Sequence, residues 1–296
     1  MNRNLRTDIA RALGSDVASA TSVSGGDINE AYRVTLADRR DVFVKCNART
    51  PPGMFAAEAR GLGWLRDVPH AIDDERSAAS GSRTSELGSD PGSVHVPGVV
   101  AVGNDWLALE WLDLERSPAP AALGRALAHL HRRGAPAFGL EEANYLATLP
   151  QDNTPEPDWP AFYIERRLRP LCARARLGLD AALDALRARP DRFGPAEPPA
   201  RLHGDLWWGN VGACNGAPVI FDPAVYGGHR EVDLAMLALF GTLPDELVAA
   251  YDEIHPLAER WRERIALHQL YPLAAHACLF GGGYGAQVKS TLARYL

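Results

Sequence analysis

The sequence has little cysteine and none of the long apolar runs that mark membrane-spanning proteins. Its 296 residues include four cysteines, which form neither the C-x-x-C pair typical of a zinc site nor the spacing of a disulfide framework. No run of about 18 apolar residues is present, and residues 1–14 lack the apolar core of a signal peptide. We therefore expect no membrane partner, a cytoplasmic location, and reduced thiols at Cys46, Cys172, Cys214 and Cys278.

The chain also lacks a block of positive charge. Its 31 Lys and Arg and 37 Asp and Glu are well mixed and give a formal net charge of −6. Proteins that bind nucleic acid or anionic membranes carry clustered basic residues, so we expect no nucleic-acid partner. The length and the 46% hydrophobic content allow two lobes that share a cleft. The sequence leaves open whether the protein is a monomer or a dimer.

The first third of the chain has the pattern of strands around one helix. Residues 31–36 and 41–46 alternate between apolar and polar side chains and predict a hairpin. The breaker TPPG precedes a predicted helix at 54–66, and residues 99–112 predict two further strands. Residues 71–93 are rich in Ser, Gly and charge, so we expect a flexible surface insertion there.

After Pro118 the apolar residues recur with the period of helices. Residues 121–134 predict one helix, and residues 159–178 predict another that is kinked or broken at Pro170. Together these patterns predict an α+β, bilobal fold. It would consist of a small β-rich N-lobe at 1–112 and a larger α-helical C-lobe at 113–296.

The stretch RLHGDLWWGN, at 201–210, carries the strongest chemical signal. Asn210 follows Asp205 by five residues, and Asp222 follows it by 17, after the apolar segment VIF. Phosphoryl transfer needs a carboxylate that accepts the proton of the attacking hydroxyl, and oxygen ligands that hold Mg²⁺. The spacing matches the catalytic loop of protein kinases, with Gly204 in place of arginine. We expect His203 to support the loop by hydrogen bonds rather than to act as a base.

Candidate nucleotide-binding residues precede this loop. Gly25 and Gly26 stand before a predicted strand, where backbone N–H groups can approach phosphates, although a Gly-Gly pair by itself is usually a turn. Lys45 lies on the next strand and could bind phosphates, and Glu58, on the predicted helix, could hold it by an ion pair. An extended hinge could offer backbone groups to adenine, or could be an ordinary strand edge, at Glu110, Trp111 and Leu112.

Longer stretches resemble the fructosamine kinase (ketosamine 3-kinase) family. They include GGDINEAYRV, LHGDLWWGNVG and FDPAVYGGHREVDLAM, and the resemblance runs from about Ser22 to the C-terminus, outside 71–93. The last of these blocks is far more specific than H-G-D, and it separates this family from the related aminoglycoside and choline kinases. The resemblance implies a protein-kinase-like fold, with a nucleotide-binding N-lobe and a C-lobe that carries the catalytic and acceptor sites. It also implies an ATP-dependent kinase that phosphorylates the 3-hydroxyl of ketosamines, the sugar adducts of amines. Because the phosphorylated adducts fall apart, the activity serves deglycation.

The resemblance also implies roles for individual residues. Asp205 would be the catalytic base, with Mg²⁺ held by Asn210 and Asp222. The phosphates of ATP would be positioned by Lys45, Glu58, Gly25 and Gly26. The sequence departs from the family at Trp208, where members usually carry a small residue, and at Asp27, where many eukaryotic members carry cysteine.

The acceptor site is less defined. The face of Trp207 could stack on a sugar and attract an ammonium, or pack between the lobes, and Trp208 is a weaker candidate. His229 and Arg230 could bind the acceptor, although structural roles fit them as well. Glu231 and Asp233 could cap the helix that follows.

Two other functions remain open at this point. The protein could phosphorylate another small hydroxyl substrate, such as an aminoglycoside. It could also be a nucleotide-binding pseudokinase with a regulatory role. The sequence does not indicate which sugar the ketosamine carries, or whether the acceptor is free or bound to a protein.

Overall fold

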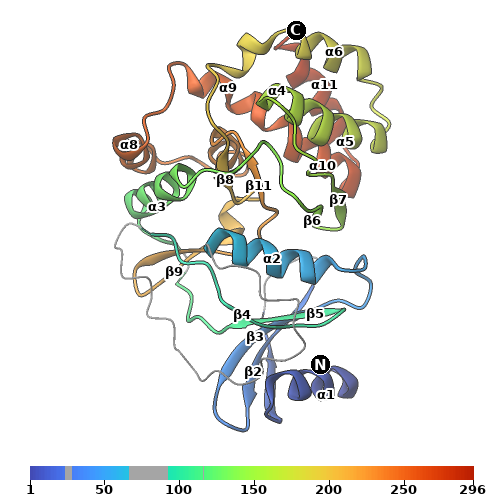
Figure 1. Cartoon of the computed structure of the whole chain (residues 1–296), viewed down its shortest axis with the longest axis vertical. Coiled ribbons are helices and arrows are strands. Elements are labelled where there is room, and N and C mark those ends of the chain that lie inside the picture. Colours follow the sequence, from blue (N-terminus) through green and yellow to red (C-terminus); the bar gives the residue numbers. More distant parts are fainter. Residues whose placement is uncertain (24–28, 67–92, 116) are drawn as a thin grey trace.

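Figure 1 shows the computed structural model, which describes residues 1–23, 29–66, 93–115 and 117–296. A five-stranded antiparallel sheet occupies one end of the molecule, and helices occupy the other (Figure 1). The strand order is β1-β2-β3-β5-β4. The strands are β1 (Val17–Ser22), β2 (Glu30–Leu36), β3 (Asp41–Cys46), β4 (Val99–Val102) and β5 (Trp106–Glu110).

A helix covers each face of this sheet, because the side chains of a strand point alternately to its two faces. On β5, Trp106 and Ala108 pack with α1 (Arg3–Leu13), whereas Leu107 and Leu109 pack with α2 (Met54–Arg66). The predicted hairpin, helix and pair of strands are confirmed. Strand β1 was not predicted, because its sequence VASATS carries little of the apolar alternation that marks a half-buried strand.

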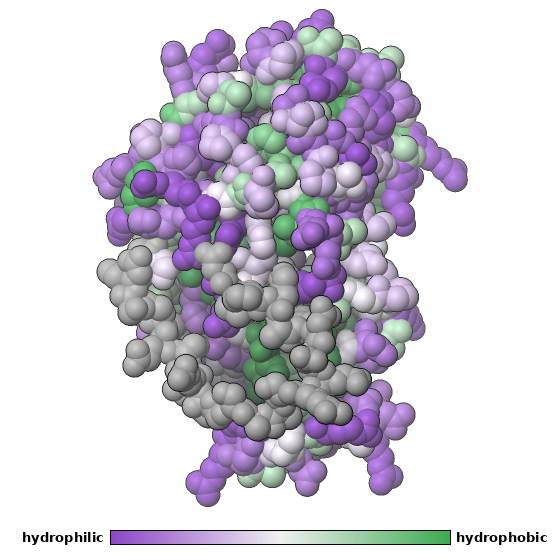
Figure 2. Space-filling model, viewed as in Figure 1, coloured by the Kyte–Doolittle hydropathy of each residue, from purple (hydrophilic) through white to green (hydrophobic). Residues whose placement is uncertain are grey.

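The rest of the chain is mainly helical. Two helices, α3 (Pro120–Arg132) and α8 (Asp245–Ile254), pack together along their length. Further helices are α6 (Asp180–Arg187), α7 (Glu231–Leu237), α9 (Trp261–His268), α10 (Leu270–Phe280) and α11 (Tyr284–Ala293). Among the described helices, none is long and apolar enough to cross a membrane. On the face shown in Figure 2, the helical end is mainly hydrophilic, with apolar residues scattered among polar ones.

Pro170 does not break the helical segment predicted around it. The segment runs from α4 (Trp159–Phe162) through a π-helical stretch (Tyr163–Leu168) into α5 (Arg169–Arg174). Proline has no backbone N–H to donate. The π-helical stretch just before Pro170 is wound more loosely than an α-helix, so the helix tolerates the missing hydrogen bond. The helix therefore continues past Pro170 and ends at Arg174, four residues before the predicted end.

Three short two-stranded antiparallel sheets carry the loops described below. They pair β6 (Asn144–Leu146) with β7 (Leu149–Gln151), β8 (Ala200–Leu202) with β11 (Tyr226–Gly228), and β9 (Val211–Cys214) with β10 (Ala217–Ile220). The loop at 203–210 joins β8 to β9, and Asp222 lies between β10 and β11. This topology brings the two predicted acids side by side.

The close packing of α3 on α8 depends on a glycine. A Cβ atom on Gly124 would lie 2.1 Å from the backbone oxygen of Leu247. Alanine raises intrinsic helix propensity by about 1 kcal/mol, but here the added methyl must push the two helices apart. We expect Gly124→Ala to lower the free energy of unfolding by about 1–3 kcal/mol, measured by urea denaturation.

Gly283 provides the matched control for this substitution. It precedes α11 with a φ of −79°, and a Cβ there would meet no atom within 4 Å. Gly283→Ala should therefore leave the free energy of unfolding unchanged or raise it slightly. Equal stability of Gly124→Ala and the wild type would contradict the close approach of α3 and α8.

Candidate active site

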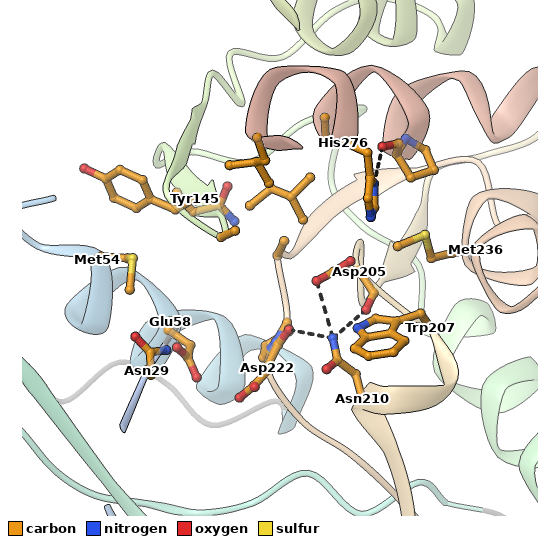
Figure 3. A pocket seen from close by; sticks show the side chains of 18 of the residues that line it. Asn29, Met54, Glu58, Tyr145, Asp205, Trp207, Asn210, Asp222, Met236 and His276 are labelled. Carbon is orange, nitrogen blue, oxygen red and sulfur yellow. Dashed lines mark hydrogen bonds between the residues drawn. The ribbon is translucent and has the colours of Figure 1, made fainter. Parts of the chain in front are cut away.

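A cavity of about 610 Å³ lies where the sheet and the helices meet. Its walls come from β2, β3 and α2 on one side and from the 203–210 loop, α7, α10 and α11 on the other. Figure 3 shows Asn210 between Asp205 and Asp222, with its amide nitrogen hydrogen-bonded to both residues. Ligand sites are typically concave, partly apolar and equipped with a few convergent polar groups. This cavity is therefore the candidate active site.

The loop at 203–210 takes its shape from Gly204. Gly204 has a φ of +81°, and a Cβ there would lie 2.1 Å from the backbone oxygen of Ala224. Only glycine adopts this conformation without strain and leaves room for the neighbouring chain. The arginine that protein kinases carry at this point cannot be accommodated here, which explains the departure from the kinase pattern.

His203 holds the loop from inside, as expected. Its Nε2 donates to the backbone oxygen of Phe221 at 3.0 Å, and its Nδ1 accepts from the backbone N–H of Asp205 at 3.3 Å. Burial lowers the pKa of His203 despite the nearby carboxylate of Asp233, so the ring is neutral at pH 7. Neither ring nitrogen is left for proton transfer.

Asp233, on α7, fixes the same loop through its carboxylate. The side chain is fully buried and accepts from the backbone N–H groups of His203 (2.8 Å) and Gly204 (3.0 Å) and from Nε2 of His131 (3.2 Å). Burial opposes its charge, but His131 and His203 lower the pKa of the carboxyl overall. The interpretation of Asp233 as a helix cap was wrong, because its oxygens face the loop.

Asp205 and Asn210 converge in the cavity. The Nδ2 of Asn210 donates to the backbone oxygen of Asp205 at 2.8 Å, with weaker contacts to the Asp205 carboxylate and the Asp222 backbone oxygen, both at 3.4 Å. These bonds orient the amide so that its oxygen lies on the side of Asp222 (Figure 3). Burial and the charge of Asp222 raise the pKa of Asp205 to about 7, although the hydrogen bond from Asn210 opposes this rise.

Lys45 connects the sheet, α2 and the loop at Asp222. Its Nζ lies 2.7 Å from Oδ1 of Asp222 and also pairs with Glu58, so the predicted pair of Lys45 and Glu58 is confirmed. Burial opposes the charge of Lys45, but the two carboxylates outweigh it and raise the pKa of the ammonium. Burial raises the pKa of Glu58 to about 7, and the charge of Lys45 acts in the opposite direction.

The cavity walls described by the structure do not include the predicted hinge of Glu110, Trp111 and Leu112. The backbone N–H of Glu110 donates to Gly98 at 2.9 Å, and its carboxylate accepts from the backbone N–H of Gly98 and contacts His95. The backbone N–H of Glu110 is therefore used within the protein, and the contact of adenine with other backbone groups of residues 110–112 stays a prediction. Gly25, Gly26, Asp27 and residues 71–92 of the expected insertion lie outside the described residues.

His229 and Arg230 were also wrong as acceptor-binding residues. Both side chains are buried, and neither belongs to the cavity wall. Arg230 forms a two-pronged pair with Glu197, at 2.7 and 2.8 Å, and donates to two backbone oxygens of the 255–256 segment. The ring of His229 stacks on that of His268, with centroids 5.2 Å apart. Both side chains therefore make their contacts inside the protein and away from the cavity.

The two tryptophans of the loop have different environments. Trp207 is 40% exposed and lines the cavity beside Asp205 (Figure 3). Trp208 packs against the apolar core that includes Leu206 and Leu237, and its ring closely approaches Gly241. Of these two tryptophans, therefore, Trp207 is the one that a substrate in the cavity can contact.

Sequence reasoning missed His276, on α10. Its Nδ1 donates to the backbone oxygen of Pro272 at 2.7 Å, and its other nitrogen points into the cavity toward Asp205 (Figure 3). The one feature of the sequence that could have indicated a functional role for His276 is its position as a polar residue within the apolar run LYPLAAHACLF. Such a residue can equally be a satisfied core histidine, so only the tertiary structure reveals its position.

The fold is that of the protein-kinase-like aminoglycoside phosphotransferases. An aminoglycoside phosphotransferase, solved as a ternary complex with ADP and hygromycin B, shares the fold with a TM-score of 0.56 at 14% identity, covering 98% of each chain. The predicted α+β kinase-like fold is therefore confirmed.

The particular family follows from closer matches. The family model described as fructosamine kinase matches residues 1–296. A "probable ketoamine kinase" of Thermus thermophilus is 38% identical, covering 90% of this chain and 89% of that protein. A structure described as a "putative fructosamine-3-kinase" from Thermobifida fusca has a TM-score of 0.81 at 38% identity, covering 100% of this chain and 99% of that one. The chain belongs to the fructosamine kinase family and is an ATP-dependent kinase.

The anchoring of the loop by Asp233 can be tested with Asp233→Asn. The amide NH₂ would face a backbone donor, so we expect the free energy of unfolding to fall by about 3 kcal/mol. Kinase activity should fall as well, because the position of Asp205 depends on the same bonds. Asp245→Asn, at an exposed side chain of α8, is the control and should change neither. The measurements are urea denaturation and initial rates.

Proposed function

We propose that this protein transfers the γ-phosphoryl group of ATP to the 3-hydroxyl of ketosamines and thereby serves deglycation. The observation that carries the proposal is the convergence of Asp205, Asn210 and Asp222 on one cavity opposite Lys45. Phosphoryl transfer depends on positioning and on charge stabilisation, which these groups provide. Family membership supports a sugar–amine adduct as the acceptor.

Asp205 would accept the proton of the substrate hydroxyl. The hydroxyl oxygen then bonds to the γ-phosphorus as the bond to the bridging oxygen breaks, and ADP leaves. A buried carboxyl with a pKa of about 7 suits this role, because a general base works best when its pKa lies near the working pH. Its position at the base of the cavity supports contact with a bound hydroxyl.

The residues present fit a magnesium site. Mg²⁺ prefers carboxylate and amide oxygens, which Asp222 and the side-chain oxygen of Asn210 supply. The side chain of Asp222 is 45% exposed, and only one of its oxygens pairs with Lys45. When bound, Mg²⁺ would neutralise charge on the transferring phosphate. Lys45, held by Glu58, would bind the other phosphates of ATP.

Trp207 and His276 would hold the acceptor. The face of an indole stacks on the apolar face of a sugar. Nδ1 of His276 donates to Pro272, so an imidazole with a single N–H leaves Nε2 as an acceptor directed into the cavity. The protonated amine of a ketosamine has N–H groups to donate to it. These two side chains support an acceptor that combines a sugar with an amine.

The nucleotide role of Lys45 can be tested cleanly, because the chain has only one other lysine, Lys289. Lys45→Met removes the charge that faces the phosphates, and we expect kcat/KM for ATP to fall by about 100-fold. Lys289→Met, at an exposed position on α11, should behave as the wild type. Initial rates over a series of ATP concentrations provide the measurement, with circular dichroism to check folding. Wild-type rates in Lys45→Met would exclude the proposed role.

One experiment can test both the role of Asp205 as the base and the identity of the acceptor substrate, by use of Asp205→Asn and a set of substrates. We expect kcat to fall by about 10²- to 10⁴-fold while ATP binding persists, because the substitution removes the proton acceptor and preserves shape. Wild type and variant would be incubated with ATP-Mg²⁺ and ribulosamine, fructosamine or an aminoglycoside, and NMR would locate the phosphate. Phosphate on an aminoglycoside and on neither ketosamine would refute the proposed substrate. ATP binding without transfer to any of them would favour a regulatory pseudokinase.

A further inference from the structure

Exposed aromatic side chains gather at the cavity. Seven large hydrophobic side chains are exposed among the described residues, and three of them line this cavity. These are Trp207, Phe240 and Phe280, which are 40%, 51% and 61% exposed. Single exposed apolar residues are ordinary, but several around one opening mark a binding surface.

The three rings belong to one continuous surface, which we call the aromatic wall. It consists of Trp207, Phe240, His276, Phe280 and Tyr284. Neighbouring ring centroids are 6.5 Å apart for Trp207 and Phe240, 5.2 Å for Phe240 and His276, 5.4 Å for His276 and Phe280, and 5.1 Å for His276 and Tyr284. The wall therefore runs without interruption from the catalytic loop to α11.

A tight turn between α10 and α11 places the far end of the wall. Gly281 and Gly282 have φ angles of +64° and +62°, a conformation that other residues rarely adopt. They reverse the chain directly after Phe280 and before Tyr284. The last ring of α10 and the first ring of α11 thus both contact His276.

Most of the acidic side chains of the cavity lie away from the wall. Among its described lining residues, Glu58 and Asp222 pair with Lys45, and the third acid, Asp205, lies where the wall begins. The wall itself carries no carboxylate that could pair with additional ammonium groups of a substrate. Its rings instead offer apolar faces, which bind apolar or aromatic groups through burial and ring contacts.

We propose that the aromatic wall binds the amine-derived part of the ketosamine and favours adducts in which that part is aromatic or bulky and aliphatic. This proposal rests on the proposed function. Trp207 begins the wall two residues after Asp205, so a substrate with its sugar hydroxyl at Asp205 extends along the wall. All ketosamines of one sugar share the same sugar part. They differ only in the amine-derived part, which is the part that the wall would contact.

Two ketosamines of the same sugar test this preference. The fructose adducts of benzylamine and of ethanolamine carry the same charge and differ in the group that would reach the wall. We expect wild-type kcat/KM to be about tenfold higher for the benzylamine adduct. In Phe280→Ala and in Phe240→Ala this ratio should fall about fivefold, mainly through KM. Both side chains are more than half exposed, so the variants should fold normally.

Val100→Ala is the control, because Val100 is 40% exposed on β4 and lies off the wall. It should keep the wild-type ratio. Equal kcat/KM for both adducts in the wild type, or an unchanged ratio in both phenylalanine variants, would overturn the role of the wall and leave the proposed function intact. Phosphorylation of neither adduct would overturn both. A wild-type dimer that the two variants convert to monomers would assign the wall to a second copy of the chain and overturn the proposal.

Discussion

The buried carboxylate of Asp233 is the interaction on which the catalytic loop depends. Strand β8 ends at Leu202, so the next two backbone N–H groups, of His203 and Gly204, have no strand partner, and one carboxylate accepts from both. A buried donor without a partner costs free energy, so the loop has one favoured path. His131, on α3, contacts both Asp233 and Tyr251 on α8. The packing of two helices is therefore tied to the position of Asp205.

A second interaction joins the sheet to this loop. Lys45 is held between Glu58 on α2 and Asp222 on the opposite side of the cavity. The buried ammonium of Lys45 is stable there only because two carboxylates face it, since an isolated charge is costly to bury. When ATP binds, Lys45 would contact its phosphates and Asp222 would bind Mg²⁺. The residues that bring the two ends of the molecule together are thus also those proposed to bind the nucleotide.

The sequence predicted the local elements that depend on neighbouring residues. The alternation at 41–46, the breaker before 54–66 and the spacing of Asp205, Asn210 and Asp222 all indicated features that the structure contains. The errors came where a polar residue had several possible partners. Arg230 pairs with Glu197, Asp233 accepts from the backbone of His203 and Gly204, and these partners are distant in sequence. No periodicity or spacing indicates such pairs.

The sequence by itself determined the fold class, the family and the acids at the base of the cavity, because these depend on hydrophobic periodicity and on short fixed spacings. Only the tertiary structure decided which side chains reach the cavity. Trp207 and Trp208 are adjacent, yet one faces the cavity and the other packs into the core. The aromatic wall combines residues from the loop after β8, the segment after α7, and α10 and α11. Their proximity arises from helix packing, which brings together positions that are far apart along the chain.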